Sequence, residues 1–363
     1  MIKYQLKTRQ ICLFFLAFAP AIKIFTLPSI LADTCKEDLW LSLTINTLLE
    51  LSIICFLLWL SKKQNLTFIQ LVEKYFGKVC CKIIIFLYFT YFLLKAFIPI
   101  NEQKAFIELA LYLNMTTDIY FLPFFAVAFY ICLKELRVFG RLADIIWFIT
   151  LFGYVILIGL SIINTDFSAI LPIGANGINK ILLGSYKASN WFGDSTYLLF
   201  FIGHFKHEKN ASIKIILSYI ASAVMVILFA IVFYGIFTSI AFRQSFALTE
   251  ISKFNTVINN VGRFDYIAIL LLLFANVFAM TLPIYFASKC FNYIISTNKK
   301  WIGATVVCSL LLICTLVFAQ YYASIEVLFS KFISAYFVLI AYVMPFILLP
   351  LALKEKKIEK RQV

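Results

Sequence analysis

The segment LAFAPAIKIFTLP at residues 16–28 interrupts the first long apolar run of the chain. Pro20 removes a backbone donor and disfavours helix at Ala19, and the cation Lys23 follows three residues later. A second interruption, NWFGDSTY, lies at residues 190–197 and places small and polar residues together in an apolar setting. We therefore expect two helices that are broken inside apolar surroundings.

The composition around these segments is that of a membrane protein. Of the 363 residues, 63% are hydrophobic and only 14% are charged, which is too few charges to solvate the surface of a soluble domain of this size. Apolar runs of roughly 20 residues cross a bilayer as helices, because an open strand would leave backbone groups unpaired in lipid. The chain is therefore expected to be an all-α membrane protein, with residues 1–363 forming a single transmembrane domain.

About ten transmembrane helices are predicted from the apolar runs. The expected spans are 11–31, 39–60, 81–100, 118–134, 142–163, 190–205, 212–240, 264–288, 301–320 and 326–350. Basic residues alternate between the connecting segments with a bias of about three to one, so both termini are predicted to be cytoplasmic. The net charge of +14 is thus a topology signal, and it does not predict binding to nucleic acid.

Two connecting segments are long enough to carry structure. Residues 61–80 place Phe68, Leu71 and Phe76 at helical spacing, which predicts a short amphipathic helix on the cytoplasmic surface of the membrane. Residues 164–189 are expected to form an external loop against the mouth of the bundle. That loop is either a lid or a packed connector.

The breaks lie in spans 1 and 6, as a five-plus-five repeat requires, with repeat one at about 10–163 and repeat two at about 190–350. Paired breaks at corresponding positions are the best sequence indication of a binding site near the membrane midplane. Exposed amide groups at one half-helix attract a carboxylate, and carbonyl groups at the other attract an ammonium. The candidate ligand-binding residues are Ala19, Pro20, Ala21, Ile22, Lys23, Phe192, Gly193, Asp194, Ser195, Tyr88, Tyr91 and Asn276.

Ionisable residues within spans indicate function by default, because burying them in lipid is costly. Lys23 in span 1 and Glu50 in span 2 are expected either to form a structural ion pair or to take part in proton coupling, with Lys23 near the break. Lys95 lies near the outer end of span 3, where it is expected to extend to the interface and not to join the site. With only two histidines, no metal site is predicted, and no cofactor or catalytic motif is present.

Several short motifs resemble those of the spore germination permeases, the membrane B subunits of germinant receptors, in the amino acid–polyamine–organocation transporter superfamily. The motifs are Arg9-Gln10, Leu27-Pro28-Ser29-Ile30-Leu31-Ala32, Ala105-Phe106-Ile107-Glu108, Gly140-Arg141-Leu142-Ala143-Asp144, Ile170-Leu171-Pro172-Ile173 with Gly184, Phe192-Gly193-Asp194 and Arg263-Phe264-Asp265. Individually these motifs are weak, and their order and spacing carry the resemblance.

The resemblance implies an inverted five-plus-five repeat with a pocket at broken helices 1 and 6. It also implies a role in sensing a nutrient such as an amino acid, with an A-type subunit and a lipoprotein C-type subunit as partners in the inner spore membrane. The chain departs from the family in carrying Lys23 where small residues are usual, Gly193-Asp194 where Gly-Glu is common, and Gly262 before Arg263. A lysine at this position would fill a cation site.

Three functions remain open at this point. The chain is a nutrient-sensing receptor subunit, a proton-coupled amino-acid or small-solute permease, or a structural subunit of a complex with a non-binding pocket. The first two need the same pocket, so the sequence does not separate them. None of the three is an enzyme.

Overall fold

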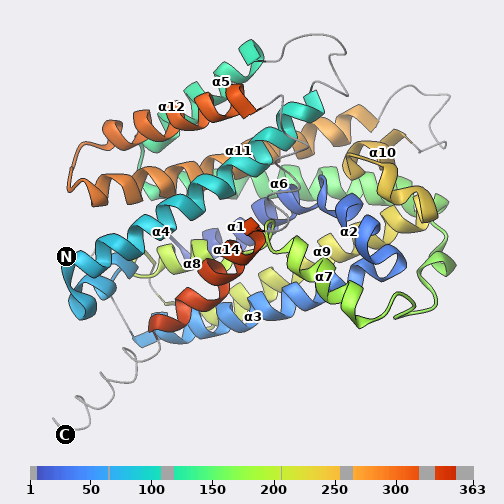
Figure 1. The fold of residues 1–363 in the computed structure, drawn as a ribbon, viewed down its shortest axis with the longest axis horizontal. Helices are drawn as coiled ribbons and strands as arrows, with labels where there is room; N and C mark the ends of the chain where they lie inside the picture. Colours follow the sequence, from blue (N-terminus) through green and yellow to red (C-terminus); the bar gives the residue numbers. More distant parts are fainter. Residues whose placement is uncertain are drawn as a thin grey trace, which may run out of the picture.

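The protein is almost entirely helical in the part that the computed structural model describes, residues 6–63, 66–107, 118–205, 207–253, 265–318 and 332–348. Outside helices, these residues form one isolated β-bridge, between Leu6 and Phe205. The helices lie side by side in one elongated bundle (Figure 1). Glu108, Arg263 and Phe264, which belong to the motifs noted above, lie outside the described residues.

Six helical segments of the described chain are long and apolar enough to cross a membrane. They contain α3 (Leu39–Lys63), α4 (Phe68–Phe106), α6 (Leu136–Ser161), α9 (Ala211–Phe237), α11 (Asp265–Ile294) and α12 (Lys300–Phe318). Shorter apolar helices are α5 (Asp118–Cys132) and the run of α14 (Ser334–Val338), the π-helix η9 (Leu339–Val343) and η10 (Met344–Leu348). Each of the predicted spans overlaps helical segments, while the total of about ten crossings stays a prediction.

The two remaining spans are broken, as the sequence indicates. The first consists of α1 (Thr8–Lys23) and α2 (Leu27–Cys35), and the other consists of α7 (Ile178–Ala188) and α8 (Ser195–Phe201). The expected external loop at 164–189 is therefore wrong in its second half, because residues 178–188 form α7. Polar residues and a glycine interrupt the apolar positions of α7, so its sequence contains no long apolar run that would indicate a spanning helix.

The first half of that connecting segment is tied to the rest of the bundle. The carboxylate of Asp38 accepts hydrogen bonds from the backbone N–H groups of Gly174 and Asn176, at 2.7 and 3.1 Å. The amide of Asn176 also donates to the carbonyl of Cys35 at 3.1 Å. These contacts favour the packed connector over the lid.

The helix α4 contains a kink at Gly77, whose φ of 80° and ψ of 169° are not helical. Residues before the kink form the predicted amphipathic helix, in which Phe68 and Leu71 are buried and Phe76 is exposed. Phe68 packs against the rings of Tyr88 and Phe200. The amphipathic helix thus contacts the bundle and does not rest on a membrane surface alone.

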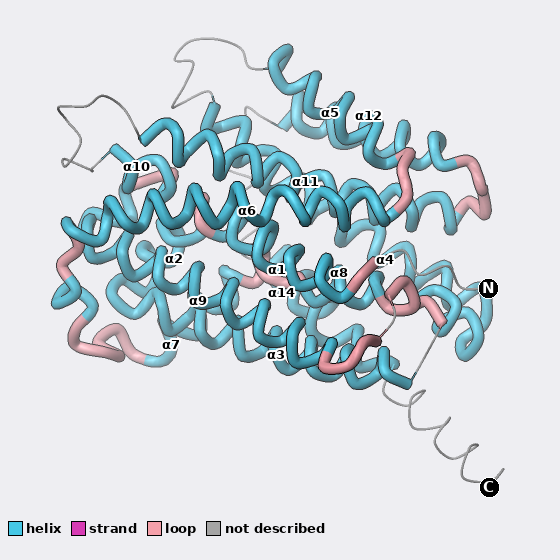
Figure 2. Tube along the Cα trace, turned by 180° about the vertical axis from the view of Figure 1, so that it is seen from behind, coloured by secondary structure: helices cyan, strands magenta, loops and turns pink. Residues whose placement is uncertain are grey.

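Of the broken helices, α1 and α8 occupy the interior of the bundle. The helix α1 packs against α6, α9 and α11, and α8 lies between α3 and α4. Figures 1 and 2 show α5 and α12 along one edge of the bundle and α3 and α7 along the opposite one. Exposed apolar residues on α6, such as Phe148 and Val155, give the bundle a surface suited to lipid.

Candidate functional site

The break in the first span begins at Ile24, after the lysine. The helix α1 continues through Pro20 and ends at Lys23, and the N–H of Ile24 donates to the carbonyl of Pro20 at 3.1 Å. Ala19, Pro20, Ala21 and Ile22 therefore lie within the helix and not in the break, which corrects the position expected from Pro20. Pro20 lacks the N–H that would donate one helical hydrogen bond. The packing of α1 against α6, α9 and α11 compensates for that loss.

The break in the other span covers residues 189–194, between α7 and α8. Gly193 has a φ of 95°, a region that side chains with a Cβ rarely adopt. A Cβ built on Gly193 would lie 2.3 Å from the hydroxyl oxygen of Tyr91, which donates to the Gly193 carbonyl at 3.4 Å. Glycine is thus required here both by the backbone conformation and by the close approach of span 3.

A buried ion cluster joins the two breaks. The ammonium of Lys23 donates to the carboxylate of Asp194, and it lies 3.9 Å from an oxygen of Glu50. It also lies 4.3 Å from the centre of the Phe192 ring, within the range of a cation–π contact. Lys23, Glu50 and Asp194 are at most 4% exposed. The last residue of α1 is therefore bonded to the residue that precedes α8.

Glu50 is fixed by two further donors. Its carboxylate accepts the backbone N–H of Ser195 at 2.7 Å and the hydroxyl of Tyr219 at 3.0 Å. Because Ser195 is the first residue of α8 and Tyr219 lies on α9, Glu50 connects α3 to both helices. The expected pairing of Lys23 with Glu50 is present, but Asp194 is the closer partner of the lysine.

Lys95 is part of the site, and the prediction that it extends to the interface is wrong. It is 4% exposed, and its ammonium donates to the carbonyls of Phe192 and, at 3.4 Å, Asn190. The ring of Phe337 lies 5.8 Å from the same ammonium. Carbonyl groups that a broken helix leaves without backbone donors thus receive a lysine from α4 instead.

Several polar side-chain atoms around the breaks are buried and have no hydrogen-bond partner. They are the hydroxyl oxygens of Thr26, Ser29, Ser195, Tyr197 and Tyr342. Thr26 immediately precedes α2, and Ser29 lies in its first turn. Buried hydroxyls without partners cost free energy, so they are suited to contact a polar molecule that enters between the broken helices.

Two of the predicted site residues make their contacts elsewhere. Tyr88 packs among the rings of Phe68, Phe92 and Phe200, and its hydroxyl has no partner. Asn276 donates to the side-chain oxygen of Gln103 at 3.0 Å. The structure thus brings together Lys23, Phe192, Gly193, Asp194, Ser195, Tyr91 and Glu50, and it adds Lys95 and Tyr219.

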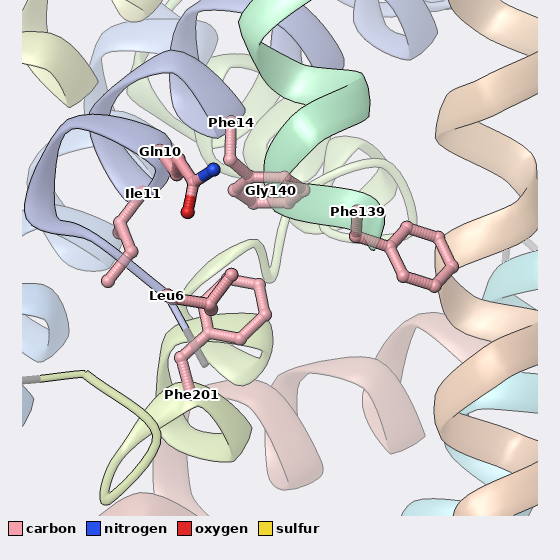
Figure 3. Close-up of a pocket in the computed structure, with 7 residues that line it drawn as sticks. All are labelled: Leu6, Gln10, Ile11, Phe14, Phe139, Gly140 and Phe201. Atoms are coloured by element: carbon pink, nitrogen blue, oxygen red, sulfur yellow. The ribbon is translucent and has the colours of Figure 1, made fainter. Parts of the chain in front are cut away.

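A small pocket lies toward the end of the bundle that holds Leu6, away from the ion cluster. Figure 3 shows Gln10, Ile11 and Phe14 of α1 around it, with Phe139 and Gly140 of α6 and Phe201 of α8. Asp144 accepts hydrogen bonds from Arg9 at 2.9 Å and from Gln10 at 3.1 Å. The motifs at residues 9–10 and 140–144 therefore contact each other. This contact gives both motifs a structural role and identifies no ligand.

No group of three or more His, Cys, Asp and Glu side chains is placed to hold a metal ion within the described ranges. The cluster that joins the breaks contains two carboxylates, and both are already in contact with Lys23. Its charged groups are one ammonium and two carboxylates.

Comparisons with known proteins agree with this architecture. The family model described as "Spore germination protein" matches residues 5–327. Crystal structures of three variants of a manganese transporter from Eremococcus coleocola resemble the chain with TM-scores of 0.61, 0.61 and 0.59, at 14%, 14% and 15% sequence identity. Each likeness covers 97% of this chain and 77% of the other, and at such identities it concerns the fold alone. A search of curated proteins gives no match.

Because the family model covers nearly the whole chain, this protein belongs to the spore germination protein family. It is a multi-pass membrane protein with a transporter-type fold, as the resemblance of its short motifs indicates.

Proposed function

We propose that the chain is the transporter-fold membrane subunit of a spore germinant receptor, which binds a small nutrient such as an amino acid between its broken helices and signals germination. The observation that carries this proposal is the buried cluster of Lys23, Asp194 and Glu50, which joins the ends of both breaks. Buried charges are costly in a membrane, and their position at paired breaks is the arrangement expected of a binding site.

An amino acid has complementary groups for both breaks. Its ammonium fits the carboxylates of Asp194 and Glu50, and its carboxylate fits the start of α2, where the hydroxyls of Thr26 and Ser29 have no partner. A ligand that contacts both half-helices changes the contacts between α1 and α8. Such a difference in contacts is what allows a ligand to shift a conformational equilibrium.

The family and the distribution of charge support a proposed location and proposed partners. Basic connecting segments favour cytoplasmic termini, and the family favours the inner spore membrane. An A-type subunit and a lipoprotein C-type subunit are the proposed partners, and a conformational change in the bundle would reach them.

A proton-coupled permease is the second candidate, and one observation favours it. Two buried carboxylates, Asp194 and Glu50, contact Lys23, and protonation of either would weaken its hold on the ammonium. Proton-dependent uptake of amino acids into proteoliposomes that contain the purified chain would support this candidate and contradict a role restricted to sensing.

Thermal unfolding of the purified full-length chain tests the proposed binding. Proteinogenic amino acids, hexoses and nucleosides are added one at a time, and a ligand that binds only the folded state raises the midpoint. We expect at least one amino acid to do so, and expect Asp194→Ala to abolish the shift.

The germination of spores in response to nutrients distinguishes a ligand-binding subunit from a structural subunit with a non-binding pocket. If the chain is a subunit with a non-binding pocket, spores carrying Lys23→Ala or Asp194→Ala will germinate as readily as the wild type. Lys187→Ala, at a half-buried site, and Asp33→Ala, at an exposed one, are the matched controls for general effects of the substitutions.

A further inference from the structure

The surroundings of the Lys23 ammonium have the composition of a binding site for a free amine. Two carboxylates, Asp194 and Glu50, lie on it, and the face of Phe192 covers it. Carboxylates provide charge-assisted hydrogen bonds, and an aromatic face attracts a cation without needing a hydrogen bond. These three side chains are called the cage below.

Two members of the cage, Glu50 and Phe192, have partners other than Lys23. Glu50 is fixed by the Ser195 N–H and the Tyr219 hydroxyl, and the carbonyl of Phe192 receives Lys95. Removal of the Lys23 side chain would therefore leave Glu50 and Phe192 in place around an empty space beside Asp194, which is the requirement for chemical rescue by a small molecule.

Charge balance favours exchange over addition. Lys23 and Lys95 provide two positive charges against the two carboxylates, so a further ammonium entering beside Lys23 would leave an unbalanced charge in a dry interior. Replacing the ammonium of Lys23 by that of a ligand leaves the charge of the cage unchanged, and the carboxylate of a zwitterionic nutrient can pair with the displaced lysine.

We propose that Asp194, Glu50 and Phe192 form a cage for primary ammonium groups, which Lys23 occupies as a built-in ligand until the ammonium of a bound nutrient displaces it. The proposal rests on the proposed function and deepens it, because it names the group of the nutrient that enters and the contact that is released.

Displacement has a mechanical consequence. Lys23 is the last residue of α1, and Asp194 precedes α8, so their contact ties the two half-helices together. A nutrient that takes over Asp194 breaks that tie. The lysine is attached to the chain and competes at a high effective concentration, so only nutrients that gain further contacts displace it.

The test is chemical rescue of Lys23→Ala. This substitution removes the atoms of a propylammonium ion, which is therefore the probe, with 1-propanol as the uncharged control and tetramethylammonium as the bulky one. The purified full-length chain is titrated and its unfolding temperature is measured. Lys187→Ala, which removes a lysine bonded to Thr34 at 2.9 Å outside the cage, is the matched control.

We expect propylammonium to stabilise Lys23→Ala with an apparent Kd at least about tenfold lower than for the wild type or Lys187→Ala, because the built-in competitor is gone. Neither 1-propanol nor tetramethylammonium should stabilise Lys23→Ala in this way. Adding Asp194→Asn to Lys23→Ala should abolish the effect. Equal affinity of propylammonium for Lys23→Ala and the wild type would overturn the proposal.

Lys23→Ala leaves two carboxylates together and carries a risk of misfolding. The second variant, Lys23→Ala with Glu50→Gln, removes one of those charges and keeps Asp194 and Phe192 for the same titration. Stabilisation by propylammonium supports the cage, and its absence in a folded double variant contradicts it.

The nutrient panel separates this inference from the proposed function. If propylammonium binds Lys23→Ala but no nutrient stabilises the wild type or triggers a response, the cage stands and the sensing role fails. If a nutrient binds the wild type but Lys23→Ala shows no tighter binding of amines, the sensing role stands and the cage fails.

Discussion

The two breaks differ in length and in what holds them. The break in the first span covers residues 24–26, and Phe25 packs there in a triad of rings with Phe106 and Phe246. The break in the other span covers residues 189–194, and its contacts are polar, with Lys23 on Asp194 and Lys95 on two carbonyls.

The difference shows how a membrane protein stabilises a break in a helix. A short break needs few substitute partners, so apolar packing is enough to hold it. A longer break leaves more carbonyl and N–H groups without helical partners, and in lipid those groups need donors and acceptors from other spans. Lys95 and Tyr91 provide donors here, and Glu50 provides an acceptor.

Loss of Asp194 is the largest expected effect. Asp194→Ala leaves Lys23 with Glu50 at 3.9 Å as its remaining carboxylate and should destabilise the protein by about 3–5 kcal/mol, as removal of one partner from a buried pair does. Thermal unfolding measures it. Asp33→Ala, at an exposed site on α2, should change the stability by no more than about 0.5 kcal/mol. Equal effects at the two sites would mean that no buried pair exists.

Gly193→Ala tests the backbone of the longer break. A Cβ there meets the Tyr91 hydroxyl and is strained at a φ of 95°, so a loss of about 2–4 kcal/mol is expected. Gly159→Ala, whose Cβ meets no atom within 4 Å, is the matched control and should be neutral or stabilising. Adding Tyr91→Phe to Gly193→Ala should recover part of the loss, and no recovery would show that the clash is unimportant.

Lys95→Met tests whether the longer break is stabilised by Lys95 as well as by Lys23. The substitution keeps the apolar stem and leaves the carbonyls of Asn190 and Phe192 without this donor, which should cost about 1–3 kcal/mol. Lys187→Met, where the partner is the Thr34 hydroxyl, should cost less. A stability of Lys95→Met equal to that of the wild type would assign Lys95 no role in holding the break.

Phe25→Leu should produce the smallest effect, about 1 kcal/mol, because leucine keeps most of the apolar packing and loses only ring contacts. The same substitution at the exposed Phe148 provides the control. A loss as large as that of Asp194→Ala would show that the short break depends on its side chains as much as the long one does.

Much of the fold could be predicted from apolar runs and loop charges, because a bilayer permits few alternatives to helices. The boundaries of the broken spans could not. Pro20 indicates a break, but its lost hydrogen bond is compensated by packing that the sequence does not show, so the helix continues to Lys23. The short and partly polar α7 has no apolar run long enough to count as a span.

The candidate site was predicted best where charge and helix disruption coincide, at Lys23, Gly193 and Asp194. The sequence suggests that Lys95 lies at the membrane interface, because it is near the end of span 3. In the structure its partners are carbonyl groups of a distant segment. Tyr219 had no signal at all, since one tyrosine among 19 is not distinguished by its neighbours.

A double-mutant cycle between Lys23→Met and Asp194→Asn tests most directly whether the ion cluster joins the two breaks. Each single change leaves a buried charge without its closest partner, and the double change removes both charges together. The account predicts that the double variant is more stable than the sum of the single effects by about 2 kcal/mol or more. Additive effects, within about 0.5 kcal/mol, would contradict it.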